Sequence, residues 1–294
     1  MELIEFAEKY GYVIIKSSNE FTIPELQKFQ KDWFNEVNQN KYTITLKSRQ
    51  MYLTTMEAIY CAWFLIFNKD EKNKIFLKSN NLSGGKRILE IVRLILVYYY
   101  EKNNEKLAPK INNQVELQLI NNNLIKVISG VNSFCLQDKI HTLIIDEAAF
   151  INDLEDILKT AYVYNLEKFI IGSTDNKEQN YFHSLYFSNF VIYKHWRRIK
   201  LHYSENKHYN NDNWLRGIEN IFNNENDFKY QVTLDIPIVQ EIVKKTESKS
   251  EIKPTRFTND MLNNIGKRLI QLDVNLSDYI RNLVAKDLKE NNII

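Results

Sequence analysis

The segment LKSRQMYLTT, residues 46–55, decides how the chain is expected to fold. It lies between KYTITL (41–46), which alternates as a strand does, and MEAIYCAWFLIF (56–67), an apolar run of helical length. A strand, a tight turn and a helix form the usual setting of a phosphate-binding loop, because the amides of the turn and of the helix N-terminus face the anion. The glycine that such a loop usually carries, and the lysine directly after it, are both absent from this segment.

The composition is that of a folded protein without a membrane span. Of its 294 residues, 44% are hydrophobic and 13% aromatic, which is enough for a packed core, and the net charge of +2 neither requires nor excludes nucleic acid. Cys61 and Cys135 lie in apolar surroundings, which indicates buried thiols in a reducing compartment rather than a disulfide or a zinc site. The longest apolar run, residues 58–67, is shorter than the roughly 20 residues that cross a bilayer, and acidic residues interrupt the N-terminus. We therefore expect a cytoplasmic protein with no membrane partner.

Strand-like and helix-like segments alternate from residue 24 to about residue 235, whereas residues 1–22 show no strong pattern. This alternation predicts an α/β fold, with a mainly parallel sheet and helices on both faces. Pro24 suits the first turn of a helix, so the first helix is expected to begin there. The expected helices cover residues 24–39, 55–67, 84–102, 152–165 and 180–190, the expected strands lie within 41–46, 74–79, 141–150 and 167–176, and a hairpin is expected over 111–129.

Three polar clusters follow directly on predicted strands: KSRQ (47–50), DE (146–147) and STDN (173–176). The strands before DE and STDN are almost continuously apolar, as expected of parallel strands that are buried on both faces. In such sheets, ligands bind at the carboxyl ends of the strands. We therefore expect the three clusters to converge on one edge of the sheet.

The first cluster and the helix after it suit a phosphate site. Lys47 and Arg49 supply positive charge within the loop. Thr54 and Thr55 stand at the start of the helix, where the hydroxyl that holds Mg²⁺ belongs. This arrangement predicts that the loop binds the phosphates of a nucleotide together with Mg²⁺.

The acidic pair completes this chemistry. Asp146, at a strand end, can hold Mg²⁺ through the hydration shell of the ion, and Glu147 can orient and deprotonate an attacking water. Ser173 and Thr174 on the neighbouring strand can sense the γ-phosphate. A strand that ends in DE is often only a solvated strand end. The hypothesis of an ATP site therefore rests on all three clusters together, on their order and on their positions after strands.

The clusters resemble the motifs of large terminase subunits, the ATPase motors that package DNA into tailed-phage and herpesvirus capsids. RQMYLTT, preceded by LKS, is similar to their deviant phosphate loop, LIIDEAAFI to their acidic motif, and FIIGSTDN followed by YFHSLY to their coupling motif. LQKFQKDWF resembles the segment whose glutamine reads adenine, here Gln30. The resemblance covers roughly residues 22–235, with four motifs in the right order, and implies a P-loop NTPase-type sheet.

The resemblance also implies a role for each site residue. Glu147 would be the catalytic base, Arg49 the arginine finger supplied in cis, and Lys47 the phosphate lysine. The implied residues are Gln30, Lys47, Ser48, Arg49, Gln50, Thr54 and Thr55 for ATP, Thr54 and Asp146 for Mg²⁺, and Ser173 and Thr174 for coupling hydrolysis to movement.

The sequence departs from the terminase pattern at three positions. Tyr52 stands where the family has glycine, Leu53 where many members have lysine, and Asp175 where a proline usually follows the Ser-Thr pair. Glycine lets the backbone approach a phosphate or take a positive φ, which a tyrosine resists. Lys47 can replace the missing lysine, as in variants that carry it at the front of the loop. ATP binding is therefore expected, whereas hydrolysis stays open.

The C-terminal part of the chain resembles a different module. Residues 214–236 are similar to the end of a terminase ATPase domain, and no spaced acidic cluster follows, so a nuclease is not expected. The hydrophilic residues 239–252 predict a linker between an ATPase domain over 1–238 and a ribbon-helix-helix-like domain over 253–294.

In ribbon-helix-helix proteins the strands of two chains pair and enter the DNA major groove, and the start of the second helix holds a phosphate. By this resemblance Arg256 would read bases with Lys253 nearby, and Asn275 or Ser277 would cap the second helix. The alternative interpretations are a helical hairpin that docks on the ATPase domain and a dimerisation tail.

Two functions compete. The first is a terminase-like ATPase of viral or mobile-element origin that moves double-stranded DNA in the host cytoplasm, as a homodimer or higher oligomer, with portal and nuclease on separate chains. The second is a DNA-binding regulator or partition protein that senses nucleotide through an impaired motor domain. Tyr52 favours the second. The first is favoured by Lys47, Arg49, Thr54, Asp146 and Glu147.

Overall fold

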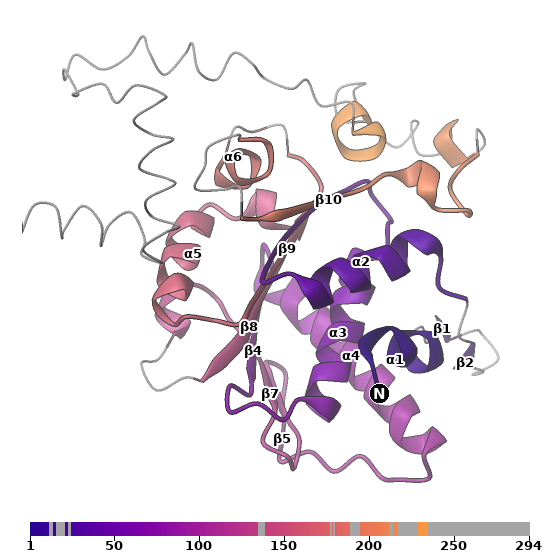
Figure 1. Ribbon diagram of the computed structural model, residues 1–294, viewed down its shortest axis with the longest axis vertical. Helices are drawn as coiled ribbons and strands as arrows, with labels where there is room; N and C mark the ends of the chain where they lie inside the picture. Colours follow the sequence, from indigo (N-terminus) through magenta and orange to yellow (C-terminus); the bar gives the residue numbers. More distant parts are fainter. Residues whose placement is uncertain are drawn as a thin grey trace, which may run out of the picture. The chain divides into compact units, whose positions relative to one another are not determined.

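One eight-stranded sheet organises the described part of the chain in this computed structural model (Figure 1). Its strand order is β10-β3-β9-β8-β4-β7-β6-β5, with parallel pairing from β10 through β7 and antiparallel pairing from β7 to β5. A separate ribbon pairs β1 (Ile14–Ile15) with β2 (Phe21–Thr22). The strands of the sheet are β3 (Tyr42–Lys47), β4 (Lys74–Lys78), β5 (Ile111–Asn112), β6 (Glu116–Gln118), β7 (Leu124–Val127), β8 (Ile140–Asp146), β9 (Lys168–Ser173) and β10 (Arg197–Leu201). The predicted mainly parallel sheet and the predicted hairpin are confirmed.

Helices cover both faces of the sheet, as the sequence predicted. Figure 1 shows α1 to α4 on one face, and α5 and α6 on the other. The α-helices are α1 (Leu3–Tyr10), α2 (Lys28–Gln39), α3 (Leu53–Phe67), α4 (Leu82–Lys102), α5 (Leu154–Val163) and α6 (Tyr181–Phe187), and the shorter turns are η1 (Val131–Ser133), η2 (Ala148–Phe150), η4 (Tyr203–Glu205) and the π-helical η5 (Lys229–Thr233). Not one of these described helices combines the length and the apolar character that a bilayer crossing requires.

The structure describes residues 1–11, 14–15, 21–22, 25–134, 139–176, 178, 180–188, 195–211, 214–216 and 228–234. The chain divides into one unit of Met1–Phe187 with Trp196–Ile236 and a second of Ser188–His195 with Pro237–Ile294, and nearly all of the second lies outside the described residues. Cys61 is buried, as predicted. The predictions that fall outside the described residues are the linker, the ribbon-helix-helix-like domain with Lys253, Arg256, Asn275 and Ser277, and the burial of Cys135.

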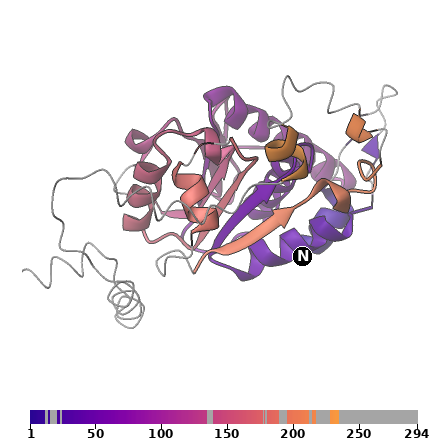
Figure 2. The same cartoon turned by 90° about the horizontal axis from the view of Figure 1, so that it is seen from above.

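The register of the sheet brings three strand ends to one level. β3 lies between β10 and β9, and its Leu46 pairs with Ser173. Asp146, the last residue of β8, pairs with Gly172 on β9. Figure 2 shows β3 beside β10, although the two strands are far apart in the sequence. The carboxyl ends of β3, β8 and β9 are therefore neighbours.

Several elements differ from the prediction, among them α2, which begins at Lys28 and not at Pro24. Residues 3–10, where the sequence showed no strong pattern, form α1, whose Phe6 and Tyr10 pack against the ring of Tyr99 on α4. β10 forms over Arg197–Leu201, where no strand was expected. An edge strand need not be apolar throughout, and β10 carries charged residues such as the exposed Arg197. Nε of Arg197 donates to Oε2 of Glu36 on α2, at 2.7 Å.

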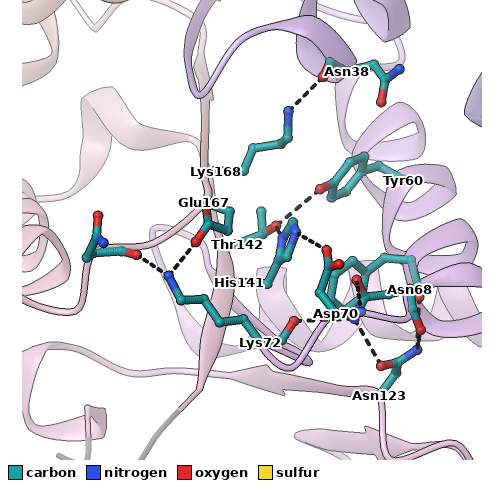
Figure 3. A network of polar contacts seen from close by, with 12 residues as sticks. Asn38, Tyr60, Asn68, Asp70, Lys72, Asn123, His141, Thr142, Glu167 and Lys168 are labelled. Atoms are coloured by element: carbon teal, nitrogen blue, oxygen red, sulfur yellow. Dashed lines mark hydrogen bonds and ion pairs between the residues drawn. The ribbon is translucent and has the colours of Figure 1, made fainter.

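One lysine fastens the amino-terminal edge of the sheet to α2 (Figure 3). Lys168, the first residue of β9, donates from Nζ to the carbonyl oxygens of Asn38 at 3.1 Å and Asn40 at 3.0 Å, and also to that of Val37. A cation is favourable at this end of a helix, because the last carbonyl groups lack partners within the helix. Burial lowers the pKa of Lys168 to about 8, because the charged form loses contact with water. The hydrogen bonds to the three carbonyl groups offset part of this cost.

A buried hydroxyl fastens α3 to the same edge. Thr142 Oγ1, on β8, lies 3.1 Å from the hydroxyl of Tyr60 on α3 and 2.7 Å from Nδ1 of His141 (Figure 3). His141 Nε2 lies 3.5 Å from Oδ2 of Asp70, and burial lowers the pKa of His141. α2 and α3 are thus bonded to the sheet at the amino-terminal ends of the strands, away from the polar clusters at the carboxyl ends.

The close approach of α4 to β7 requires glycine at position 85. A Cβ atom on Gly85 would lie 2.4 Å from Cγ1 of Val127. Gly85→Ala is therefore expected to lower the free energy of unfolding by about 1–3 kcal/mol, because an overpacked core must shift. Adding Val127→Ala should recover part of the loss, as measured by urea denaturation. Gly130→Ala, where a Cβ would lie 3.2 Å from an Asp153 oxygen, is the control; equal stability of the two alanine variants would contradict the packing argument.

Candidate functional site

The carboxyl ends of β3 and β8 meet in one polar cluster, as the sequence predicted. Nζ of Lys47, at the end of β3, lies 3.2 Å from Oε1 of Glu147, which follows β8. Thr54, in the first turn of α3, donates a hydrogen bond of 2.8 Å to Oδ2 of Asp146. The side chain of Lys47 is only 8% exposed. A cation, a hydroxyl and two carboxylates therefore share one largely buried site.

The loop between β3 and α3 turns without glycine. Gln50 and Tyr52 have φ values of 63° and 58°, in the left-handed region that glycine usually occupies. Holding a larger residue there costs on the order of 1–3 kcal/mol. The N–H group of Ser48 donates to the carbonyl oxygen of Leu201 on β10, at 2.8 Å. α3 begins directly after the loop, at Leu53, and the start of a helix is a favourable place for an anion.

Thr54 and Asp146 form an oxygen pair that suits a Mg²⁺ ion. Asp146 is 4% exposed; burial raises the pKa of its carboxyl group, while Lys47 and the Thr54 hydroxyl oppose the rise. No group of three or more His, Cys, Asp or Glu residues is arranged for a metal in the part of the chain that the structure describes. Mg²⁺ usually binds to one or two carboxylates together with water and substrate phosphates. The pair therefore fits a Mg²⁺ ion that arrives with a polyphosphate.

Glu147 lies directly after β8 and contacts Lys47. Its backbone is left-handed, with a φ of 56°, and its N–H group donates to Oδ1 of Asp146 at 2.9 Å. Its side chain is 31% exposed and pairs with Lys47. The partly exposed carboxyl group of Glu147 and the buried lysine at the end of β3 therefore lie together.

The end of β9 is connected to the segment that follows Glu147. Oγ of Ser173 accepts a hydrogen bond of 3.1 Å from the N–H group of Ala149 in η2, and Thr174 is buried. The side chain of Asn180, directly before α6, donates to the carbonyl oxygen of Ala149. The segment that follows Glu147 is therefore hydrogen-bonded both to the end of β9 and to the residue before α6.

Two of the predicted nucleotide ligands have structural partners in this state. Oγ of Ser48 donates to the carbonyl oxygen of Val232 at 2.6 Å and accepts from the N–H group of Tyr203 at 3.0 Å. Gln30 is buried, and its Oε1 accepts from the N–H group of Gln27 at 2.8 Å, at the start of α2. Ser48 would have to release Val232 to donate its hydroxyl proton to a nucleotide, whereas an amide oxygen such as Oε1 of Gln30 can accept a second hydrogen bond.

The other predicted loop ligands lie on the outer side of the loop or in the first turn of α3. Nε of the exposed Arg49 donates to Oε1 of Gln231 at 2.5 Å. Thr55 is half-buried, and its N–H group donates to the carbonyl oxygen of Tyr52 at 3.0 Å. Gln50 is exposed. The roles of these residues as ligands stay predictions.

A further acid, which the sequence patterns did not single out, lies beneath the loop. Glu57 on α3 is fully buried, and neither of its carboxyl oxygens has a hydrogen-bond partner among the described residues. Burial raises the pKa of Glu57 well above its usual value, Asp146 adds to the rise, and Lys47 opposes it. Its Oε1 would lie 3.3 Å from a Cβ atom at Gly172, so it sits against the end of β9. The only sequence signal was a single acid inside the apolar run 56–67.

Solved structures of large terminases share this fold. No family model matches the sequence, and no curated protein is significantly similar to it. The HK97 bacteriophage large terminase has a TM-score of 0.61 and 13% identity, over 80% of this chain and 54% of that one. The Thermus phage P74-26 large terminase ATPase domain has a TM-score of 0.55 and 12% identity, over 71% and 92%. The large terminase from a further thermophilic bacteriophage, in complex with ATP-gamma-S, has a TM-score of 0.54 and 12% identity, over 71% and 52%.

The coverage identifies the part that is shared. This chain spans about half the length of the HK97 protein and of the protein in complex with ATP-gamma-S, and nearly all of the P74-26 ATPase domain. The chain therefore has the fold of these large terminase ATPase domains.

Glu57 gives the stability of the protein a pH dependence. Its folded-state pKa is raised by burial, so from about pH 4.5 upward the unfolded chain loses this proton before the folded protein does. This contribution to stability is present at low pH and is lost as the pH rises. We expect Glu57→Gln to remove it, so that the free energy of unfolding of the variant falls less between pH 5 and pH 8 than that of the wild type.

Denaturation at both pH values measures this difference. Glu101→Gln, an exposed change on α4, is the control and should leave the slope unchanged. Parallel slopes for the wild type and Glu57→Gln would show that Glu57 is already ionised in the folded protein.

Proposed function

We propose that the chain is a terminase-like ATPase that uses Mg²⁺-ATP to move double-stranded DNA. The observation that carries the proposal is the convergence of a lysine, a threonine hydroxyl and two carboxylates at neighbouring strand ends. These are the groups that phosphoryl transfer requires, because its catalysis rests on positioning and on neutralising charge. The fold shared with large terminase ATPase domains, one of them in a protein in complex with ATP-gamma-S, supports the same conclusion.

In the proposed cycle, Lys47 changes its partner when ATP binds. Its ammonium group now pairs with Glu147. A triphosphate at the start of α3 would compete for Lys47 with several charged oxygens, which would leave Glu147 able to orient and deprotonate water. Thr54 and Asp146 would hold Mg²⁺, which supplies further neutralising charge to the phosphates when bound.

The remaining roles follow from the positions of the side chains. Arg49 is exposed at the loop and would supply the arginine finger in cis, while Lys47 would replace the lysine that is common at the position of Leu53. Ser173 would pass a displacement onward through its bond to η2, with Thr174 beside it. Gln30 would read adenine after releasing the start of α2.

The DNA-binding part of the proposal rests on the sequence of the C-terminal segment. A ribbon-helix-helix-like domain would pair two chains and place Arg256 and Lys253 in the major groove, with Asn275 or Ser277 next to a phosphate. The motor would act in the host cytoplasm, with the portal and the nuclease on separate chains.

A second candidate function is favoured by two observations at the loop. Tyr52 holds a left-handed conformation that glycine would adopt without strain, and Lys47 neutralises the proposed base in this state. A protein that binds ATP without turning it over would act as a nucleotide-sensing DNA-binding regulator or partition protein.

Turnover of ATP separates the two functions. We expect the wild type to hydrolyse ATP faster with duplex DNA than without it. Glu147→Gln should retain nucleotide affinity and lower turnover by about 10²- to 10⁴-fold, the range over which a general base contributes. Phosphate release with and without DNA measures the rate, and equilibrium binding of ATP-gamma-S measures the affinity.

Glu155→Gln, an exposed change on α5, is the matched control and should keep both properties. ATP binding without turnover in the wild type would favour the regulator over the motor. Turnover that survives Glu147→Gln would remove Glu147 from the role of base.

A further inference from the structure

Four aromatic side chains form a stacked column against the phosphate loop. The ring of Tyr52 stacks on that of Tyr209, with centroids 6.0 Å apart and planes at 22°. Tyr209 stacks on Trp214 at 4.7 Å and 23°, and Trp214 stacks on Tyr203 at 5.8 Å and 26°. Only Tyr52 belongs to the loop, and the other three follow β10 in the sequence. We call these four residues the aromatic column.

The column contacts both left-handed residues of the loop. The hydroxyl groups of Tyr52 and Tyr209 lie 2.8 Å apart, within hydrogen-bonding distance. Nε1 of Trp214 donates to Oε1 of Gln50 at 3.4 Å. Gln50 and Tyr52 are the loop residues with positive φ, so each strained position has its own partner in the column.

The column is itself fixed to the rest of the site. The N–H group of Tyr203 donates to Oγ of Ser48 at 3.0 Å, so the far end of the column returns to the loop. Asn206 and Lys207 lie between Tyr203 and Tyr209 in the sequence. The N–H group of Lys207 donates to Oε1 of Gln27 at 2.8 Å, and Nε2 of Gln27 donates to Oδ1 of Asn206 at 3.1 Å. The segment that carries the column is therefore anchored at the start of α2 as well as at the loop.

We propose that Tyr209 and Trp214 are positioning residues that hold the phosphate loop in the conformation that glycine would otherwise provide. The inference rests on the proposed nucleotide-binding role of the loop. A tyrosine at a left-handed position favours other backbone conformations when it is released. Contacts that favour the left-handed state raise the population of the loop that is ready to bind phosphate, and the apparent affinity rises in proportion.

A double-mutant cycle tests this coupling. Tyr209→Ala should weaken binding of a fluorescent ATP analogue by about tenfold, because a stacked ring and a hydrogen bond are lost. Tyr209→Phe, which keeps the ring, should weaken binding less. In a Tyr52→Gly background position 52 no longer needs Tyr209, so adding Tyr209→Ala should change the dissociation constant by less than about twofold. Tyr164→Ala, which removes a ring after α5, is the control.

Hydrogen exchange of the loop without nucleotide gives a second readout. We expect Tyr209→Ala to speed exchange of the amides of residues 48–55, and expect no such effect in the Tyr52→Gly background. If the wild type binds no nucleotide while this exchange pattern holds, the proposed function fails and the positioning role stands. Tighter or unchanged nucleotide binding in Tyr209→Ala, or equal effects in both backgrounds, would overturn the inference. Melting temperatures of all variants exclude global unfolding as the cause.

Discussion

The site depends on a buried lysine that faces two carboxylates where neighbouring parallel strands end. The side chain of Lys47 is 8% exposed, and a buried ammonium group needs a partner of opposite charge. Glu147 supplies the partner, and Asp146 holds Glu147 in place through a backbone hydrogen bond. The strand register fixes these positions, because Asp146 pairs with Gly172 in the same sheet that carries Lys47. A triphosphate that takes Lys47 from Glu147 would therefore disturb the whole edge.

The polar contacts at the two ends of the strands differ. At the amino-terminal ends, Lys168 and Thr142 form hydrogen bonds that connect the sheet to α2 and α3. At the carboxyl edge, Glu147 and Tyr52 have left-handed backbones, and Glu57 has an unsatisfied carboxyl group as far as the described residues show. Strain and unsatisfied polar groups concentrate at functional sites.

The sequence allowed prediction of the elements that follow a simple period. β8 and β9 are continuous apolar runs that end in polar residues, so both the strands and their convergence could be predicted. α1 could not, because a helix of this length is stabilised mainly by packing against distant helices, here through rings such as Phe6 and Tyr99. The aromatic column could not be predicted, because Tyr52 and Tyr209 are brought together by the fold alone and no periodicity relates them. The buried position of Glu57 could not be predicted, because a single acid in an apolar helix is indistinguishable in the sequence from a surface residue.

A crystal structure of the protein with Mg²⁺ and ATP-gamma-S tests the central claim most directly. The account predicts that the γ-phosphate lies at the start of α3 and contacts Lys47, that the contact between Lys47 and Glu147 is broken, and that Mg²⁺ lies against Thr54 and Asp146. Nucleotide bound elsewhere, or Lys47 still paired with Glu147 beside a bound triphosphate, would contradict it.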